Sequence, residues 1–303
     1  MIATARQLFL NVNTRLTENV ATRDSLEERF FCSLHMSNGV YKRTWAGRLG
    51  DVDQILITEF QRLDVVPKTF LDVAVSSGVS TINWFESLQR AGLRPSMTAT
   101  DLTMTVYLLR LFRWLHVLVE KEGFPLQYDV FGLAWRPRCR IRFYIFGNGF
   151  LTMLWHILYQ IMVRRFDVMT RLKFLKGNPP PIDDPVIKAQ IKLVTYQLRD
   201  NKDIELLDDD ITKPTPPNLR SRFEVIRAAN ILNQTYFSAQ QLREAVRNLR
   251  DRLVGAGAFL VIVRTEETGI NHGSVLRLGD NGSFEVLARV GRGSEIEDIV
   301  LSI

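Results

Sequence analysis

The chain has 303 residues, of which 46% are hydrophobic and 24% charged, with a formal net charge of +6. This composition supports one large domain or two modest ones with ample core. The two cysteines and four histidines are scattered, which gives no support for a metal site, a redox pair or a Ser-His-Asp triad, and residues 1–15 mix arginine and asparagine into their apolar residues, unlike a signal peptide.

The first part of the chain is predicted to be helical. Three amphipathic segments, at residues 26–31, 40–49 and 52–63, define an N-terminal helical region over residues 1–68. The remainder, residues 69–303, is predicted to be an α/β domain.

Residues 70–82 form the most informative segment. Apolar residues lead into Asp72, small residues follow, and apolar residues then recur at helical spacing from Thr81 to Leu88. This order predicts a strand, a tight turn and a helix start, where backbone N–H groups can approach a nucleotide-like ligand. The small residues of the turn are Ala74, Ser76, Ser77 and Gly78.

The spacing of this turn resembles motif I of the class I S-adenosylmethionine (SAM) methyltransferases, acidic-x-Gly-x-Gly-x-Gly. Asp72 takes the acidic place, Ala74 and Ser76 replace the first two glycines, and Gly78 is the third. The resemblance implies a Rossmann-like methyltransferase sheet, SAM as cofactor, and N-terminal helices that either cover the site or pack on the sheet edge. Asp72 also fits a plain capping role, and that alternative stays open.

A second strand is predicted at residues 96–101, ending in Asp101. An acid at this place accepts hydrogen bonds from ribose hydroxyl groups in dinucleotide and SAM folds. The resemblance therefore places Asp101 and the following Leu102 in the cofactor site, although Asp101 is equally suited to cap the next helix.

A long insertion over residues 103–200 separates the second strand from the third. Connections of this length are uncommon unless they carry function. Residues 116–130 predict a β-hairpin that turns at Glu122-Gly123, and residues 143–163 contain no Asp, Glu, Lys or Arg.

Basic residues flank this charge-free segment. Residues 136–176 contain nine basic side chains and one acid, so this stretch carries +8 and the rest of the chain sums to −2. The basic character is local, which argues against a nucleic-acid surface spread over the fold but leaves a local RNA contact open.

Residues 143–163 are long enough to cross a bilayer. A single crossing would place the second and third strands of one sheet on opposite sides, so we expect an in-plane or re-entrant segment at an anionic membrane surface. The protein would then be cytoplasmic and peripherally or monotopically membrane-associated. A buried helix or a dimer contact is the alternative, and a homo-oligomeric state stays open.

The chain then returns to the predicted sheet. A Pro-rich connector at residues 176–185 precedes a predicted helix at Ala189–Leu198 and a third strand at residues 203–211 that ends in acids. The resemblance places Asp209 or Asp210 near the adenine amino group of the cofactor, whereas an acidic run is commonly just solvated charge.

The fourth strand and its loop, residues 222–232, resemble the Phe-Asp-x-Ile-x-x-x-Asn-x-Leu stretch of the chemotaxis-receptor methyltransferases. Asn230 occupies the cofactor-contacting asparagine place, and Asn233, Gln234 and Tyr236 would lie near the acceptor. Asn230 also suits a simple turn-closing role.

Local patterns define the last elements. Ser238 and Gln241 form a capping box before an amphipathic helix, which ends at Gly255 or Gly257. The apolar run 259–263 predicts a buried central strand, and residues 274–288 predict a hairpin with an Asp-Asn-Gly turn.

Two functions follow from this sequence. The first is a SAM-dependent methyltransferase whose acceptor, a small molecule, a lipid or a protein, is not defined by the sequence; no catalytic residue is assigned, because methyl transfer needs chiefly positioning. The second is a non-catalytic membrane adaptor on a degenerate methyltransferase fold, which the replaced glycines of the turn would explain.

Overall fold

The chain divides into two units, and each combines segments that are distant in sequence. A computed structural model describes residues 2–10, 20–42, 44–137 and 148–303. Unit 1 comprises Met1–Arg43 and Thr105–Leu193, and unit 2 comprises Thr44–Met104 and Val194–Ile303. The expected boundary at residues 68/69 lies inside unit 2, and the expected insertion at 103–200 corresponds closely to the second segment of unit 1.

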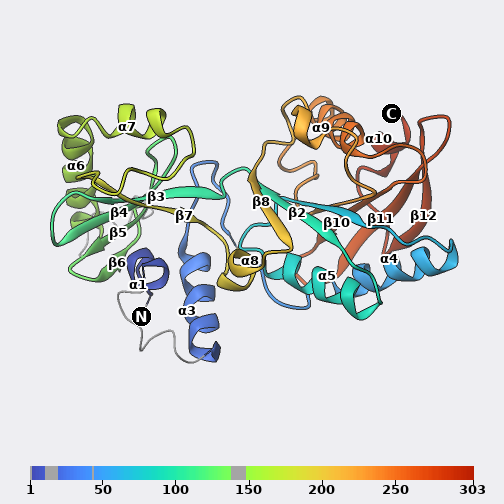
Figure 1. The fold of residues 1–303 in the computed structure, drawn as a ribbon, viewed down its shortest axis with the longest axis horizontal. Helices are drawn as coiled ribbons and strands as arrows, with labels where there is room; N and C mark the ends of the chain where they lie inside the picture. Colours follow the sequence, from blue (N-terminus) through green and yellow to red (C-terminus); the bar gives the residue numbers. More distant parts are fainter. Residues whose placement is uncertain (1, 11–19, 43, 138–147) are drawn as a thin grey trace. The chain divides into compact units, whose positions relative to one another are not determined.

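Unit 2 is built on a seven-stranded sheet in the order β12-β11-β10-β9-β1-β2-β8 (Figure 1). Its first five strands in chain order are parallel: β1 (Thr69–Val73), β2 (Ser96–Asp101), β8 (Ile204–Asp208), β9 (Val225–Ala229) and β10 (Phe259–Thr265). Their order is that of a doubly wound sheet, so the strand order reverses between β1 and β9, and the carboxyl ends there form the usual ligand crevice of such sheets. The predicted Rossmann-like α/β fold is confirmed.

Helices cover both faces of this sheet. The helices α4 (Gly50–Arg62), α5 (Val79–Arg90) and α8 (Tyr196–Asp200) pack on one face, and α9 (Ala239–Arg252), α10 (Glu297–Leu301) and the 3-10 turn Pro217–Leu219 pack on the other. Neighbouring strand residues face opposite sides, as Phe70 and Leu71 do. The capping box of Ser238 and Gln241 is formed as predicted.

The sheet ends in an antiparallel meander. β11 (Asn271–Leu278) pairs antiparallel with β10 and with β12 (Phe284–Val290), so the predicted C-terminal hairpin is confirmed.

Unit 1 contains a five-stranded antiparallel sheet in the order β6-β5-β4-β3-β7. Its strands are β3 (Thr105–Arg110), β4 (Leu115–Glu120), β5 (Pro125–Val130), β6 (Leu133–Trp135) and β7 (Ile187–Lys192). The helices α1 (Ala5–Phe9) and α3 (Val20–Ser33) share one core with this sheet, and α6 (Asn148–Arg165) and α7 (Val168–Leu175) share the other. The hairpin predicted at residues 116–130 is confirmed as β4 and β5.

Two local predictions are wrong. Residues 189–198 form the end of β7 and the start of α8 rather than one helix, because Ile187-Lys-Ala-Gln-Ile-Lys192 alternates with the period of a strand. The middle segment of the predicted N-terminal helices, residues 40–49, forms an isolated bridge and turns in its described residues, 40–42 and 44–49, and Gly39 and Gly47 on either side of Val40 and Trp45 have φ of 85° and 73°.

The charge-free segment 143–163 overlaps α6, and its first residues lie outside the described part of the chain. Within the described residues, no helix combines the length and apolar character needed to cross a membrane.

Candidate functional site

The turn after β1 has a backbone conformation that glycine adopts more readily than other residues. The φ angles of Ala74, Ser76 and Gly78 are 57°, 59° and 86°, so all three glycine places of the resemblance lie in the left-handed region. Each such angle costs a residue with a side chain roughly 1–2 kcal/mol relative to glycine. The turn therefore keeps a glycine-type shape although two of its residues carry side chains.

Gly78 is also required by packing. A Cβ atom at this position would lie 2.1 Å from Leu198 Cδ2, because α8 packs against the start of α5. The backbone N–H of Thr195 donates to the carbonyl of Ser77 over 2.9 Å, which fixes α8 beside the turn. The third glycine place thus allows close approach of a helix, as in dinucleotide folds.

The turn meets the end of the neighbouring strand through Asp101. The Ser76 N–H donates to Asp101 Oδ2 over 2.7 Å, and the Thr103 N–H donates to Asp101 Oδ1 over 3.2 Å. Asp101 is half-buried and Leu102 beside it is 51% exposed. The carboxyl ends of β1 and β2 therefore present a backbone turn, a carboxylate and an apolar side chain together.

Asp72 is part of a buried charge cluster. Its carboxylate accepts from Arg227 Nε and Nη2 over 3.1 and 2.7 Å and from the Thr81 hydroxyl over 2.8 Å, while Arg227 Nη1 donates to Asp53 over 2.8 Å. The Arg227 guanidinium also stacks 4.2 Å from the centre of the Trp84 ring. Asp72 and Arg227 are 2% and 1% exposed, so this carboxylate holds β1, β9 and α4 together.

The sequence analysis did not single out Arg227 or Asp53. The available signal was an arginine inside the apolar strand Val225-Ile-Arg-Ala-Ala229, because a buried charge requires partners. Burial raises the pKa of Asp53 to about 6, even though the adjacent Arg227 opposes that shift.

The two acids expected near adenine have different surroundings. Asp209 forms a buried ion pair with Arg252, with N–O distances of 2.5 and 3.2 Å. Asp210 is half-buried, and its Oδ1 accepts from the backbone N–H and the hydroxyl of Thr212 over 3.0 and 2.6 Å. The Asp209 N–H donates to the Asp101 carbonyl over 3.0 Å. Asp209 and Asp210 therefore follow the carboxyl end of β8, beside Asp101 at the carboxyl end of β2.

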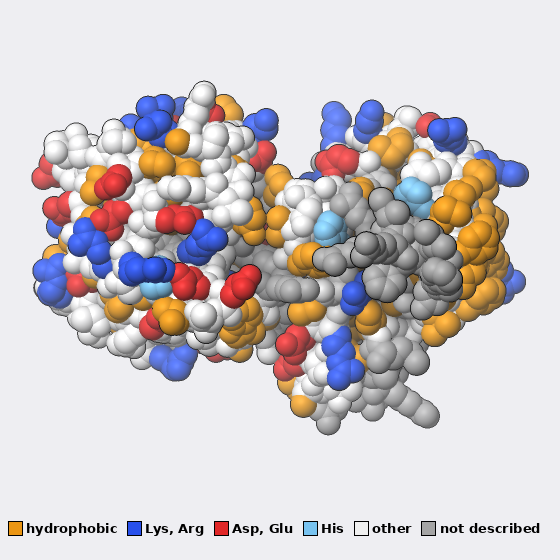
Figure 2. Space-filling model, turned by 180° about the vertical axis from the view of Figure 1, so that it is seen from behind, with side chains coloured by type: hydrophobic (Ala, Val, Ile, Leu, Met, Phe, Trp, Pro, Cys, Tyr) orange, Lys and Arg blue, Asp and Glu red, His pale blue; other side chains and the backbone are white. Residues whose placement is uncertain are grey.

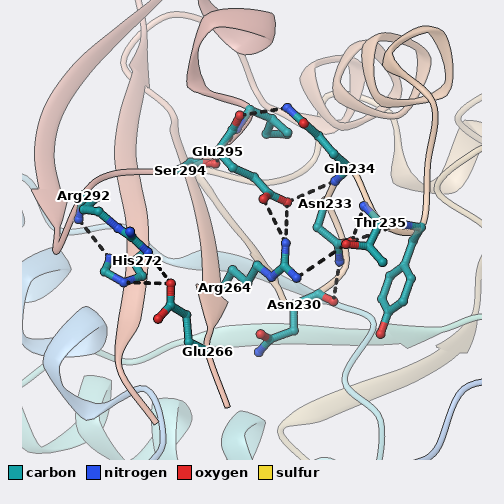
Figure 3. Close-up of polar contacts among 12 residues, drawn as sticks. Asn230, Asn233, Gln234, Thr235, Arg264, Glu266, His272, Arg292, Ser294 and Glu295 are labelled. Carbon is teal, nitrogen blue, oxygen red and sulfur yellow. Dashed lines mark hydrogen bonds and ion pairs between the residues drawn. The ribbon is translucent and has the colours of Figure 1, made fainter. Parts of the chain in front are cut away.

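Asn230 closes the end of β9 onto β10. It has φ of 60°, and its Oδ1 accepts from the Thr265 N–H over 2.7 Å. Asn233 is buried, and its Oδ1 accepts from the N–H groups of Thr235 and Tyr236, each over 3.1 Å. These amides shape their own loop (Figure 3).

A second loop braces the same region. Glu295 accepts from the Gln234 N–H over 3.0 Å and from Arg264 Nη1 over 2.9 and 2.8 Å. The Gln234 side chain donates to the Glu295 carbonyl over 3.2 Å, as Figure 3 shows. Of the side chains expected near an acceptor, Asn233 is buried, whereas Gln234 and Tyr236 are exposed, Tyr236 at 53%.

Arg48 is a positively charged residue near the carboxyl ends of the strands, and the sequence analysis also missed it. It precedes α4, its carbonyl accepts from Asn271 Nδ2 over 2.7 Å, and its Nε is buried without a hydrogen-bond partner in the described part of the chain. Burial and the charge of Arg227 lower the pKa of Arg48, whereas Asp72 raises it, so Arg48 lies within electrostatic reach of the motif.

No family model and no curated protein matches the chain. Among solved structures, the CMeT domain of citrinin polyketide synthase is 12% identical with a TM-score of 0.34; the match covers 83% of this chain and 41% of that one. The N-methyltransferase NodS from Bradyrhizobium japonicum WM9, in complex with S-adenosyl-L-homocysteine, is 10% identical with a TM-score of 0.31 and coverages of 74% and 65%.

A putative zinc-dependent alcohol dehydrogenase from Rhodobacter sphaeroides also matches, with 12% identity, a TM-score of 0.30 and coverages of 69% and 45%. The chain spans less than two thirds of the length of these three proteins. Because these TM-scores are low, the assignment of the fold rests on the strand order of the sheet itself. The resemblance of residues 222–232 to chemotaxis-receptor methyltransferases stays a prediction.

Proposed function

We propose that unit 2 binds SAM and transfers its methyl group to an acceptor. The observation that carries this proposal is the turn of Ala74, Ser76 and Gly78, whose three left-handed residues are bonded through the Ser76 N–H to Asp101. A tight turn at a helix start beside an acid on the next strand suits a ribose-containing ligand.

Each predicted residue then has a defined role. The backbone of residues 74–78 faces the cofactor, Asp101 accepts the ribose hydroxyls, and Leu102 covers the adenine. A carboxylate has about four acceptor positions, so accepting from the Ser76 and Thr103 N–H groups does not by itself prevent Asp101 from accepting ribose hydroxyls. Asp210 suits the adenine amino group better than Asp209, whose carboxylate pairs with Arg252.

Asp72 and Arg48 act differently from each other. Asp72 supports the turn from below through Arg227 rather than touching the ligand. Arg48 offers its guanidinium to the carboxylate of the cofactor, because a buried Nε without a partner is costly until an anion binds. Asn230 faces the cofactor, and the loop after it borders the acceptor, with Gln234 and Tyr236 as its exposed side chains.

SAM supplies an electrophilic methyl group, and the protein's task is to position the acceptor and exclude water. The acceptor is a small molecule, a lipid or a protein, and we propose that it is met at an anionic membrane surface.

Titration calorimetry with SAM and with S-adenosylhomocysteine tests the proposal. Asp101→Ala should weaken SAM binding by about 1–3 kcal/mol, since it leaves ribose hydroxyls unpaired. The matched control is Asp203→Ala, which removes an exposed carboxylate just before β8, at the other end of the neighbouring strand. Wild-type protein that shows no binding at millimolar SAM contradicts the enzyme proposal.

A second candidate function is a non-catalytic adaptor on the same fold. Ala74 and Ser76 favour it, because their side chains add bulk where the backbone would approach the ligand. The calorimetric titration separates the two functions, since an adaptor with a closed turn binds neither SAM nor its product.

A further inference from the structure

The helix α6 is apolar both on the face that packs against the sheet of unit 1 and on the opposite, exposed face. Tyr159, Met162 and Val163 are buried against the sheet of unit 1. The opposite side exposes Phe150 (57%), Leu151 (37%), Met153 (41%), Leu154 (43%), Ile157 (48%) and Ile161 (52%).

These exposed residues form one continuous stripe. Phe150, Leu154, Ile157 and Ile161 are spaced three or four residues apart, so they lie above one another along the helix. Figure 2 shows apolar side chains along the edge of unit 1 where Figure 1 draws α6. A helix that is apolar all round is normally covered on every side, so this stripe is a surface that meets a partner.

Aromatic rings extend the apolar surface. Trp155 of α6 lies 6.0 Å from Trp114, which stacks on Phe112 and on Phe131, each at 5.3 Å between ring centres. Phe131 is 74% exposed. Aromatic side chains of this kind favour the boundary between lipid and water.

The charges beside the stripe identify the partner. α6 ends in the exposed Arg164 and Arg165, and residues 148–176 hold five basic side chains and one acid. In a symmetric dimer through this stripe, the basic rim would face the same basic rim of the second copy, so like charges would meet. An anionic lipid surface matches both the apolar stripe and the basic rim.

We propose that the exposed stripe of α6 is a docking surface for an anionic lipid bilayer, with the helix lying in the plane of the interface. The apolar side chains enter the boundary of head groups and acyl chains, and Arg164 and Arg165 contact lipid phosphates. The proposed function explains only why the protein would dock on a membrane, and in that respect this proposal rests on it. Vesicle binding is measured without SAM, so it tests the docking surface separately.

Vesicle co-sedimentation tests the surface, with phosphatidylcholine alone and with phosphatidylcholine mixed with phosphatidylserine. Leu154→Glu with Ile157→Glu should abolish pelleting. The matched control, Gln160→Glu with Thr170→Glu, adds the same charge at exposed polar positions of α6 and α7 and should pellet nearly as wild type. Arg164→Gln with Arg165→Gln should weaken binding to the mixed vesicles about thirty-fold, at about fivefold for each arginine.

Circular dichroism of each variant checks folding, and Leu154→Gln with Ile157→Gln replaces the glutamate pair if that pair unfolds. Wild-type protein that pellets with neither vesicle overturns the proposal, and so does pelleting that the stripe variants leave unchanged. Equal pelleting with both vesicles overturns the assignment to an anionic surface. A dimer in light scattering that the stripe variants dissociate, without vesicle binding, assigns the stripe to a second copy instead.

SAM titration of the same samples is read separately, so protein that pellets but binds no SAM refutes only the proposed enzyme.

Discussion

Replacing Arg227 with methionine should be the most damaging single change in unit 2. Methionine keeps much of the apolar volume over Trp84 but removes the positive charge that Asp53 and Asp72 share. Both carboxylates are at most 3% exposed, so they would remain in the core without a counter-charge. Breaking a buried pair by removing one partner costs about 3–5 kcal/mol, which is a large part of the stability of an ordinary domain.

The loss should depend on pH in a defined direction. Without Arg227 the folded-state pKa of Asp53, which burial already raises, rises further above its unfolded value, so the folded protein binds more protons than the unfolded chain. Stability then increases as the pH falls toward about 4 and decreases as the pH rises. Lowering the pH from 7.5 to 5 should therefore recover part of the loss.

Urea unfolding at both pH values, followed by circular dichroism, measures this effect. Arg222→Met is the matched control, because Arg222 pairs with Glu205 at the surface, where an ion pair contributes about 0–1 kcal/mol. A loss below about 1 kcal/mol for Arg227→Met, or a loss that is the same at pH 5 and 7.5, would refute the argument.

Two further predictions concern the same unit. Since the pKa of Asp53 rises from 3.8 to about 6 on folding, wild-type stability should fall by up to about 3 kcal/mol as the pH rises through that window, and Asp53→Asn should remove this slope in pH-dependent thermal melts. Gly78→Ala should destabilise the domain by well over the ~1–2 kcal/mol of its left-handed backbone, because its Cβ would collide with Leu198. Gly92→Ala has nearly the same φ, 85°, with no atom within 4 Å of the added Cβ, so similar melting temperatures for the two variants would argue against the collision.

Only those parts of the candidate site that depend on neighbouring residues could be predicted from the sequence. The pattern of residues 70–88 is sufficient to place a strand, a turn and a helix, because those elements follow from side-chain spacing and from residues that tolerate a left-handed backbone. The partners of the acids could not be found in this way. Asp72 pairs with a residue 155 positions away, and Asp209 with one 43 positions away.

By itself the sequence determined the strand, turn and helix of residues 70–88, the capping box at Ser238 and the hairpins at residues 116–130 and 274–288, since each follows from periodicity or turn chemistry within a few residues. The doubly wound sheet of unit 2 was expected from the resemblance of such segments, taken in chain order, to a methyltransferase fold. The tertiary structure decided how distant segments combine. It joined residues 1–43 to the insertion in one unit, and it turned the residues after the Pro-rich connector into an edge strand. It also divided α6 into a covered and an exposed apolar face, which a sequence apolar on both faces could not reveal, because burial depends on which neighbours the sheet brings to the helix.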